Sequence, residues 1–201
     1  MIKNNFRNFR IGVASLMFVL SLAVIGGFAQ TSPSHIGNVK IRNFGQMDER
    51  FYRGAQPAKD DYQSLRDLGV KTVIDLQEKP TNYEKAAVEA LGMTYINIPM
   101  DDTEYPKPEA IEKFLNIMND SSTGVVYVHC KGGKHRTGVT GAVYRFTKYG
   151  WDYDKAYQEM LNYDFYTKWG RQVIKDFVVD YAGKMKAEKA QISSSVQAGT
   201  K

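Results

Sequence analysis

The run HCKGGKHRTG, residues 129–138, contains the only cysteine in the chain of 201 residues. It follows four apolar residues, 125–128, and precedes a pattern that is typical of a helix. Five residues separate Cys130 from Arg136, a spacing at which a strand-to-helix loop can direct its backbone N–H groups and the helix dipole at one tetrahedral dianion. A thiol at the base of such a loop has a lowered pKa and is a nucleophile aimed at phosphorus.

The other residues of this run fit the same chemistry. Gly132 and Gly133 permit positive φ and a close approach of the backbone to a ligand. The planar guanidinium of Arg136 can hold two phosphate oxygens, and the hydroxyl of Thr137 can assist the sulfur as a leaving group. The alternative is a buried structural cysteine beside a solvated basic turn. The coincidence of strand, glycines, arginine spacing and helix start favours the nucleophile.

The motif Cys-x5-Arg-Thr resembles the signature of the protein tyrosine and dual-specificity phosphatase superfamily. The whole run looks most like the atypical dual-specificity group of plants, fungi and bacteria. The similarity extends to FYRGAQP at 51–57 and VKTVIDL at 70–76, and it covers roughly residues 40–182. The resemblance implies hydrolysis of a phosphorylated substrate through a phosphocysteine intermediate, with no metal and no cofactor.

That mechanism requires a general acid on a second loop. The segment IPMDDTEYPKP, residues 98–108, offers Asp101 and Asp102, and Glu104 stands in reserve. We prefer Asp102 because its Pro-x-x-Asp spacing and the following threonine resemble the acid loops of related phosphatases, and Asp101 is the alternative acid. Adjacent carboxylates in a proline-flanked loop are also ordinary turn chemistry.

The charges of the loop bear on the substrate. Its candidate phosphate-binding residues are Lys131, Gly132, Gly133, Lys134, His135 and Arg136. The two lysines resemble the pattern of inositol-lipid phosphatases and would suit a ligand with several phosphates. Alternatively, they point to water and only raise the local potential. We expect a phosphoprotein (Tyr or Ser/Thr) or an inositol phosphate as substrate.

The elements around these motifs alternate between strands and helices. Strands are predicted at 39–44, 50–53, 70–76, 93–98 and 125–129, and helices at 59–68, 83–91, from Pro108, up to Gly150, from Asp152, and around 173–181. This order predicts an α/β fold, a central and mostly parallel sheet flanked by helices, like that of dual-specificity phosphatases. Because ligands sit beyond the carboxyl ends of such strands, Asp102 should lie near Cys130.

The two ends of the chain differ from its body. Residues 1–29 have a basic start, an apolar run and small residues before Gln30, which predicts a signal peptide and an exported protein, periplasmic or extracellular. An uncleaved run would instead anchor the chain in a membrane. Residues 30–39 read as a linker, 40–183 as the phosphatase domain and 184–201 as a disordered tail. Without residues 1–29 there are 24 basic and 22 acidic residues, too balanced for nucleic acid. We expect a monomer.

Two further functions remain open at this point. A phosphate-binding pseudophosphatase is disfavoured by the joint presence of a nucleophile, an arginine and an acid. A rhodanese-like sulfurtransferase also uses a loop cysteine, but Arg136 and Thr137 directly after the loop favour phosphoryl chemistry. Upstream, Arg53 and Gln56 could be either substrate contacts or part of a turn-stabilising salt bridge, and they are left outside the predicted site.

Overall fold

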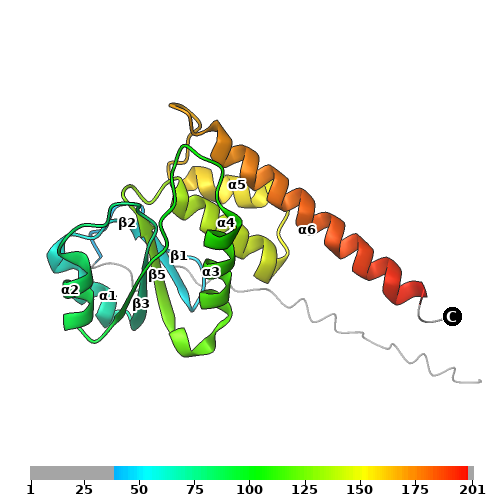
Figure 1. The fold of residues 1–201 in the computed structure, drawn as a ribbon. Helices are drawn as coiled ribbons and strands as arrows, with labels where there is room; N and C mark the ends of the chain where they lie inside the picture. Colours follow the sequence, from blue (N-terminus) through cyan, green and yellow to red (C-terminus); the bar gives the residue numbers. More distant parts are fainter. Residues whose placement is uncertain (1–38, 199–201) are drawn as a thin grey trace, which may run out of the picture. The chain divides into compact units, whose positions relative to one another are not determined.

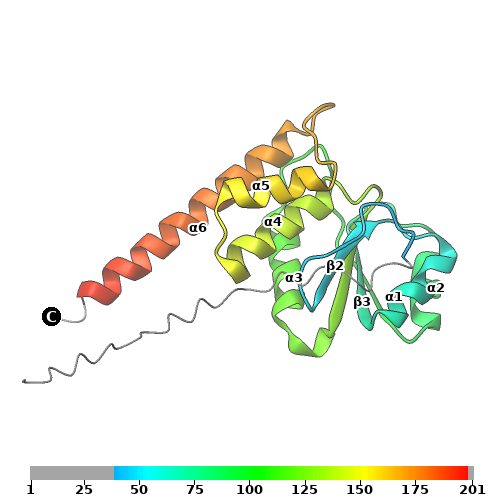
Figure 2. The same ribbon diagram turned by 180° about the vertical axis from the view of Figure 1, so that it is seen from behind.

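A five-stranded sheet forms the centre of the part of the chain that the computed structural model describes, residues 39–198 (Figures 1 and 2). Its strands are β1 (Gly45–Gln46), β2 (Phe51–Ala55), β3 (Val70–Asp75), β4 (Thr94–Asn97) and β5 (Val125–Cys130). They lie in the order β1-β2-β5-β3-β4, and only the β1–β2 pair is antiparallel. The predicted α/β fold with a mostly parallel sheet is confirmed.

The strand that leads to the cysteine is the central one. Parallel strands β2 and β3 flank β5 on its two sides, and a strand buried on both faces is expected to be almost wholly apolar. Along β5, Val126, Val128 and Cys130 pack on one face of the sheet, whereas Tyr127 packs on the other. This position fixes the end of β5 from both sides.

Helices cover both faces of the sheet. They are η1 (Lys59–Asp61), α1 (Tyr62–Asp67), α2 (Glu84–Ala90), α3 (Pro108–Asn119), η2 (Ser121–Thr123), α4 (Arg136–Tyr149), α5 (Tyr153–Asn162) and α6 (Gln172–Ala198). α1 and α2 pack on the face that contains Tyr127 (Figure 1). α3, α4, α5 and α6 build the larger apolar core on the opposite face. The sheet, including the strand that leads to Cys130, therefore lies between two packed layers of helices.

Local signals set several helix ends. Pro108 is the first residue of α3, where its missing N–H costs nothing. The carboxylate of Asp152 accepts a hydrogen bond from the backbone N–H of Lys155 and caps α5. α4 ends at Gly150, whose φ of 62° is a left-handed cap. These three predictions are confirmed.

Two predictions differ from the structure, and others lie outside it. Residues 39–44 form no strand because Asn43, with φ of 52°, turns the chain before β1. The tail predicted to be disordered continues α6 to Ala198, since it lacks proline and adds a Lys184–Glu188 pair at i,i+4. The signal segment 1–29, linker residues up to 38 and residues 199–201 lie outside the described residues. No described helix has the length and apolar character that crossing a bilayer requires.

Candidate active site

The candidate nucleophile lies where β5 ends and α4 begins. Cys130 is the last residue of β5 and Arg136 is the first of α4, so the residues between them form the catalytic loop, 131–135. Only 2% of Cys130 is exposed. Its sulfur is thus enclosed at the carboxyl end of the central strand, as the motif predicts.

The surroundings of Cys130 favour its thiolate. Burial alone raises the pKa of this thiol, but the pKa nevertheless lies below its ordinary value. The charge of Arg136 lowers it most, and hydrogen bonds from Thr137 and from the backbone N–H of Gly132 lower it further. The loop therefore supplies both the positive charge and the N–H donors that the sequence pattern predicts.

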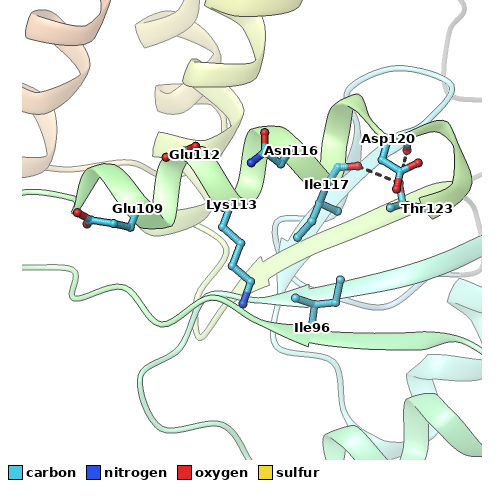
Figure 3. A pocket seen from close by; sticks show the side chains of 8 residues that line it. All are labelled: Ile96, Glu109, Glu112, Lys113, Asn116, Ile117, Asp120 and Thr123. Carbon is cyan, nitrogen blue, oxygen red and sulfur yellow. Dashed lines mark hydrogen bonds between the residues drawn. The ribbon is translucent and has the colours of Figure 1, made fainter.

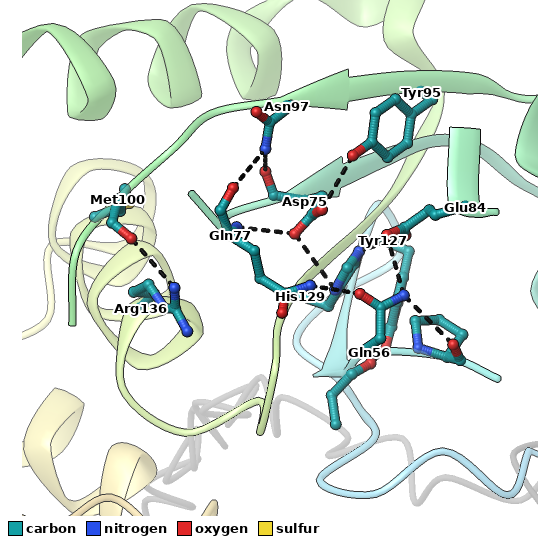
Figure 4. Close-up of polar contacts among 12 residues, drawn as sticks. Gln56, Asp75, Gln77, Glu84, Tyr95, Asn97, Met100, Tyr127, His129 and Arg136 are labelled. Atoms are coloured by element: carbon teal, nitrogen blue, oxygen red, sulfur yellow. Dashed lines mark hydrogen bonds and ion pairs between the residues drawn. The ribbon is translucent and has the colours of Figure 1, made fainter. Parts of the chain in front are cut away.

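The two predicted loops meet through an arginine. Nη1 of Arg136 donates to the carbonyl oxygen of Met100 at 3.2 Å (Figure 4). Met100 immediately precedes Asp101 and Asp102 in the chain. The structure thus joins the start of the acid loop to the catalytic loop, although Asp102 lies 28 positions before Cys130 in the sequence.

The two adjacent carboxylates have different partners. Oδ1 of Asp101 accepts from the backbone N–H of Thr103 at 2.6 Å and from its hydroxyl at 2.7 Å, and these bonds lower the pKa of Asp101. Oδ2 of Asp102 accepts from Nε and Nη2 of Arg171, at 3.0 and 2.8 Å. Glu104, the reserve, is exposed. Asp101 therefore stabilises its own turn, whereas Asp102 is tied to the residue before α6.

A buried polar network surrounds His129, the residue that precedes Cys130 in the chain (Figure 4). Nε2 of His129 lies 2.7 Å from Oε1 of Glu84, and its Nδ1 lies 3.9 Å from Oδ1 of Asp75. Burial alone lowers the pKa of His129, but the hydrogen bond and charge of Glu84, with the charge of Asp75, raise it overall. These partners of His129 come from distant parts of the chain, and no local sequence pattern reveals them.

Three residues of this network could in principle hold a metal ion. Ligand atoms of Asp75, Glu84 and His129 lie within 4.8 Å of one another, which would allow a cation. All three side chains are fully buried and are already bonded to neighbours, among them Tyr95 and Gln56. We therefore interpret them as a hydrogen-bonded support of β5.

The remaining loop residues are less free than the sequence indicates. Nζ of Lys134 pairs with Oδ2 of Asp164 at 3.2 Å. Nε2 of His135 lies 3.0 Å from the carbonyl oxygen of Tyr166, and burial, followed by the charge of Arg171, lowers the pKa of His135 to about 4. His135 is therefore neutral near pH 7 and adds no positive charge for further phosphates. Lys131 is exposed.

One residue outside the predicted site touches the catalytic loop directly. Arg53 is 1% exposed, and its Nη2 donates to the carbonyl oxygen of Gly133 at 2.5 Å. Arg53 therefore supports the catalytic loop, and within residues 39–198 it forms no salt bridge. The signal for it was available in the motif FYRGAQP, where an arginine stands inside a strand that the core buries.

Two large hollows lie elsewhere on the domain. A groove of about 560 Å³ runs along α3 beside Ile96 of β4, with Lys113 and Asn116 on its wall (Figure 3). A second one, of about 610 Å³, lies between α3 and α6. Neither is lined by the nucleophile or the loop arginine, so neither is the candidate site.

Comparison with known proteins relates the chain to a family of phosphatases. Residues 28–175 match the family model PTP-NADK, described as DSP-PTPase phosphatase fused to NAD+ kinase. The chain is 35% identical over 118 residues to NAD kinase 2, chloroplastic, of Arabidopsis thaliana, covering 55% of this chain but only 12% of that relative. It is 26% identical to the dual specificity protein phosphatase TpbA of Pseudomonas aeruginosa, covering 73% and 72% of the two chains. Inositol diphosphatase DSP2 of Oryza sativa is 28% identical over 53% of this chain and 55% of its own.

Solved structures show the same fold. A cysteine-to-serine variant of P. aeruginosa TpbA in complex with pTyr aligns with a TM-score of 0.61 and 25% identity, over 72% of this chain and 89% of that one. The catalytic core of the PP-IP phosphatase Siw14 of S. cerevisiae aligns with a TM-score of 0.64 at 20% identity, over 77% and 94%. At this identity the second similarity concerns the fold alone.

Proposed function

The chain belongs to the PTP-NADK family of DSP-PTPase phosphatases, and from this premise we propose that it hydrolyses phosphomonoesters through a phosphocysteine intermediate on Cys130. That it is a phosphatase of the dual-specificity type follows from the family and the relatives. The observation that carries the mechanism is the placement of Cys130, a buried thiol at the end of β5 that faces the charge of Arg136 and loop N–H groups, which lower its pKa.

The proposed reaction has two displacements. The Cys130 thiolate attacks phosphorus, the bond from phosphorus to the ester oxygen breaks, and Asp102 gives its proton to that oxygen. Water then attacks the phosphocysteine while Asp102 takes the proton of the water, and the sulfur leaves as a thiolate beside Thr137. Arg136 and the loop N–H groups hold the equatorial oxygens in both steps. Inorganic phosphate and the free alcohol are the products.

The partners of the two carboxylates favour Asp102 as the acid. Both bonds from Arg171 end on Oδ2 of Asp102, and within residues 39–198 its Oδ1 accepts no hydrogen bond. That oxygen is available to carry a proton toward the substrate. Asp101 is less suited because its hydrogen bonds to Thr103 hold its pKa low.

For the substrate we propose a phosphoprotein, with phosphotyrosine first. The pair between Lys134 and Asp164 and the neutral His135 leave few free cations for additional phosphates. The structure of TpbA in complex with pTyr also supports phosphotyrosine as the first candidate. An inositol phosphate is the second candidate, supported by the exposed Lys131 and by the relative named inositol diphosphatase.

The test is a set of assays on the purified chain. Cys130→Ser should abolish hydrolysis and keep phosphate binding, because the loop donors and Arg136 remain. Arg136→Lys should be severely impaired despite its charge, since the bidentate geometry is lost. Wild-type activity should persist in EDTA. Turnover by Cys130→Ser, or transfer of sulfur from thiosulfate to cyanide, would contradict the mechanism.

The place of action is a separate proposal. The basic and apolar start of the chain supports export, so N-terminal sequencing of protein from the native host should find a mature end near Gln30. An intact Met1 in the cytosol would refute export, and an intact Met1 in a membrane fraction would indicate an anchor.

A further inference from the structure

The outward side of the catalytic loop is held by one segment of the chain, residues 43–56. Three successive loop carbonyls accept hydrogen bonds from this segment. The bonds run from Gln56 N to Lys131 O (3.4 Å), from Asn43 Nδ2 to Gly132 O (2.8 Å) and from Arg53 Nη2 to Gly133 O (2.5 Å). A segment some 80 residues upstream thus fixes which way each loop peptide faces.

The direction of these peptides determines what the loop can bind. The C=O and N–H of a trans peptide point to opposite sides, so a carbonyl that is held outward turns the N–H of the next residue inward. The first peptide shows this directly. Its carbonyl, on Lys131, accepts from Gln56, and its N–H, on Gly132, donates toward Cys130 and lowers the pKa of the thiol. Inward N–H groups are what a tetrahedral oxyanion needs.

The second observation concerns the charge of Arg53. Its guanidinium carbon lies 3.9 Å from the centre of the Tyr163 ring, and the residue is almost fully buried. Within residues 39–198, no carboxylate lies at ion-pair distance from Arg53. A buried cation without a paired anion is costly. The charges that offset this cost are those of Glu159, which is itself ion-paired with Arg145, and of the Cys130 thiolate, to which an oxyanion bound in the loop would add.

We propose that Asn43 and Arg53 form a carbonyl clamp, two positioning residues that hold the catalytic loop with its N–H groups inward and lend it a buried positive charge. The ligand class is a tetrahedral oxyanion, and the inference rests on the proposed function of the same loop. Neither residue touches the reacting atoms. Both act through the carbonyls of Gly132 and Gly133.

The sharpest variant is Asn43→Gly. Asn43 has φ of 52°, a conformation that glycine adopts freely. This change therefore removes the amide donor without straining the backbone at residue 43. Arg53→Lys keeps a charge but lacks the planar group that spans Tyr163 and the loop. Arg50→Lys is the matched control, because Arg50 also donates to backbone carbonyls, of Gly124 and Asp120, away from the loop.

Three readouts on the full chain separate positioning from mere folding. They are kcat and KM on an aryl phosphate, the rise in Tm with orthovanadate, and the pH profile of alkylation of the single cysteine by iodoacetamide. We expect Asn43→Gly to lower kcat/KM about 5- to 10-fold, the effect of one hydrogen bond, and to move the alkylation profile to higher pH. Arg53→Lys should lose most of the Tm rise with orthovanadate. Arg50→Lys should change none of the three.

The outcomes separate this inference from the proposed function. If Asn43→Gly and Arg53→Lys match the wild type in all three readouts, the clamp is overturned. If Arg53→Lys fails to fold, Asn43→Gly alone decides, with wild-type readouts overturning the clamp and the expected shifts supporting it. A wild type without any phosphatase activity would contradict the proposed function. In that case, the alkylation profiles still decide the clamp, because they require no turnover.

Discussion

Replacing Gly133 by alanine should destabilise the protein and displace the catalytic loop. Gly133 has φ of +67°, and a Cβ built on it would lie 2.5 Å from the carbonyl carbon of Gly54, 2.6 Å from its oxygen and 2.7 Å from the backbone nitrogen of Ala55. These atoms belong to β2, which pairs with β5 along its whole length, so they cannot yield as a flexible side chain would. The loop must move instead.

The magnitude follows from two costs. An alanine in the left-handed conformation costs about 1–2 kcal/mol. Forcing a methyl group into a packed site costs about 1–3 kcal/mol more. Together they predict a loss of about 2–5 kcal/mol in the free energy of unfolding, which corresponds to a fall in Tm of roughly 4–20 °C for a domain of this size. Activity should fall with it, because the carbonyl that Arg53 holds belongs to Gly133.

Two glycines in the same chain serve as controls for the separate costs. Gly92 also has a positive φ, +72°, but nothing lies within 4 Å of its added Cβ, so Gly92→Ala should show the backbone cost of about 1–2 kcal/mol alone. Gly132, in the loop itself, lacks a positive φ, and its Cβ would meet only the Lys134 side chain, at 3.6 Å. Gly132→Ala should therefore leave Tm nearly unchanged. The measurement is the Tm of each variant from differential scanning calorimetry. A Gly133→Ala variant no less stable than Gly92→Ala would refute the steric argument.

Three other predictions concern the acid, the substrate and the buried network. Asp102→Asn should slow hydrolysis of substrates with poor leaving groups by roughly 10²–10⁴-fold, and less for an aryl phosphate; if only Asp101→Asn shows this pattern, the choice of acid is wrong. Lys131→Ala should weaken the binding of inositol polyphosphates more than that of a simple monoester, and added salt should reduce the difference. Equal losses for both substrates in steady-state kinetics would show that Lys131 only raises the local electrostatic potential. Glu84→Gln should lower the free energy of unfolding, measured by chemical denaturation, by about 3–5 kcal/mol, since the buried His129 loses the closer of its two charged partners. Because the pKa of His129 is raised in the folded state, that loss should be complete below about pH 6.5, the pKa of an unfolded histidine, and should shrink as pH rises through the folded value. A loss that does not change with pH would show that the pair is not ionised.

The features predicted correctly from the sequence are set by neighbours in the chain. A β-branched run indicated β3, and Pro108, Asp152 and Gly150 marked helix ends through local backbone chemistry. The prediction of a disordered tail after residue 183 was wrong because the helix there depends on contacts made earlier in α6. Its lysines and serines read as disorder, yet they are acceptable helix formers once the preceding turns of α6 are packed on the core, and extending an existing helix requires no new nucleus.

The supports of the nucleophile could not be predicted in the same way, because they come from distant parts of the chain. β5 lies between β2 and β3, so the ends of all three parallel strands meet at one edge. Gln56 follows β2 and Gln77 follows β3, and the amide of Gln77 donates to that of Gln56 across the end of β5 (Figure 4). The pairing of His129 with Glu84 depends on the same order of strands, which no local pattern reveals.

The proposed carbonyl clamp implies that the signature alone is not sufficient for catalysis. Loop N–H groups face a ligand only if the carbonyls on the other side of the same peptides are held, and here the holding groups stand at 43, 53 and 56, outside the signature. A chain that kept the run from Cys130 to Arg136 but lost these donors would retain the nucleophile and the arginine while its loop peptides were free to turn. We therefore expect activity in such a chain to fail in kcat before phosphate binding fails, since Arg136 can hold an oxyanion without the ordered N–H groups that stabilise the transition state.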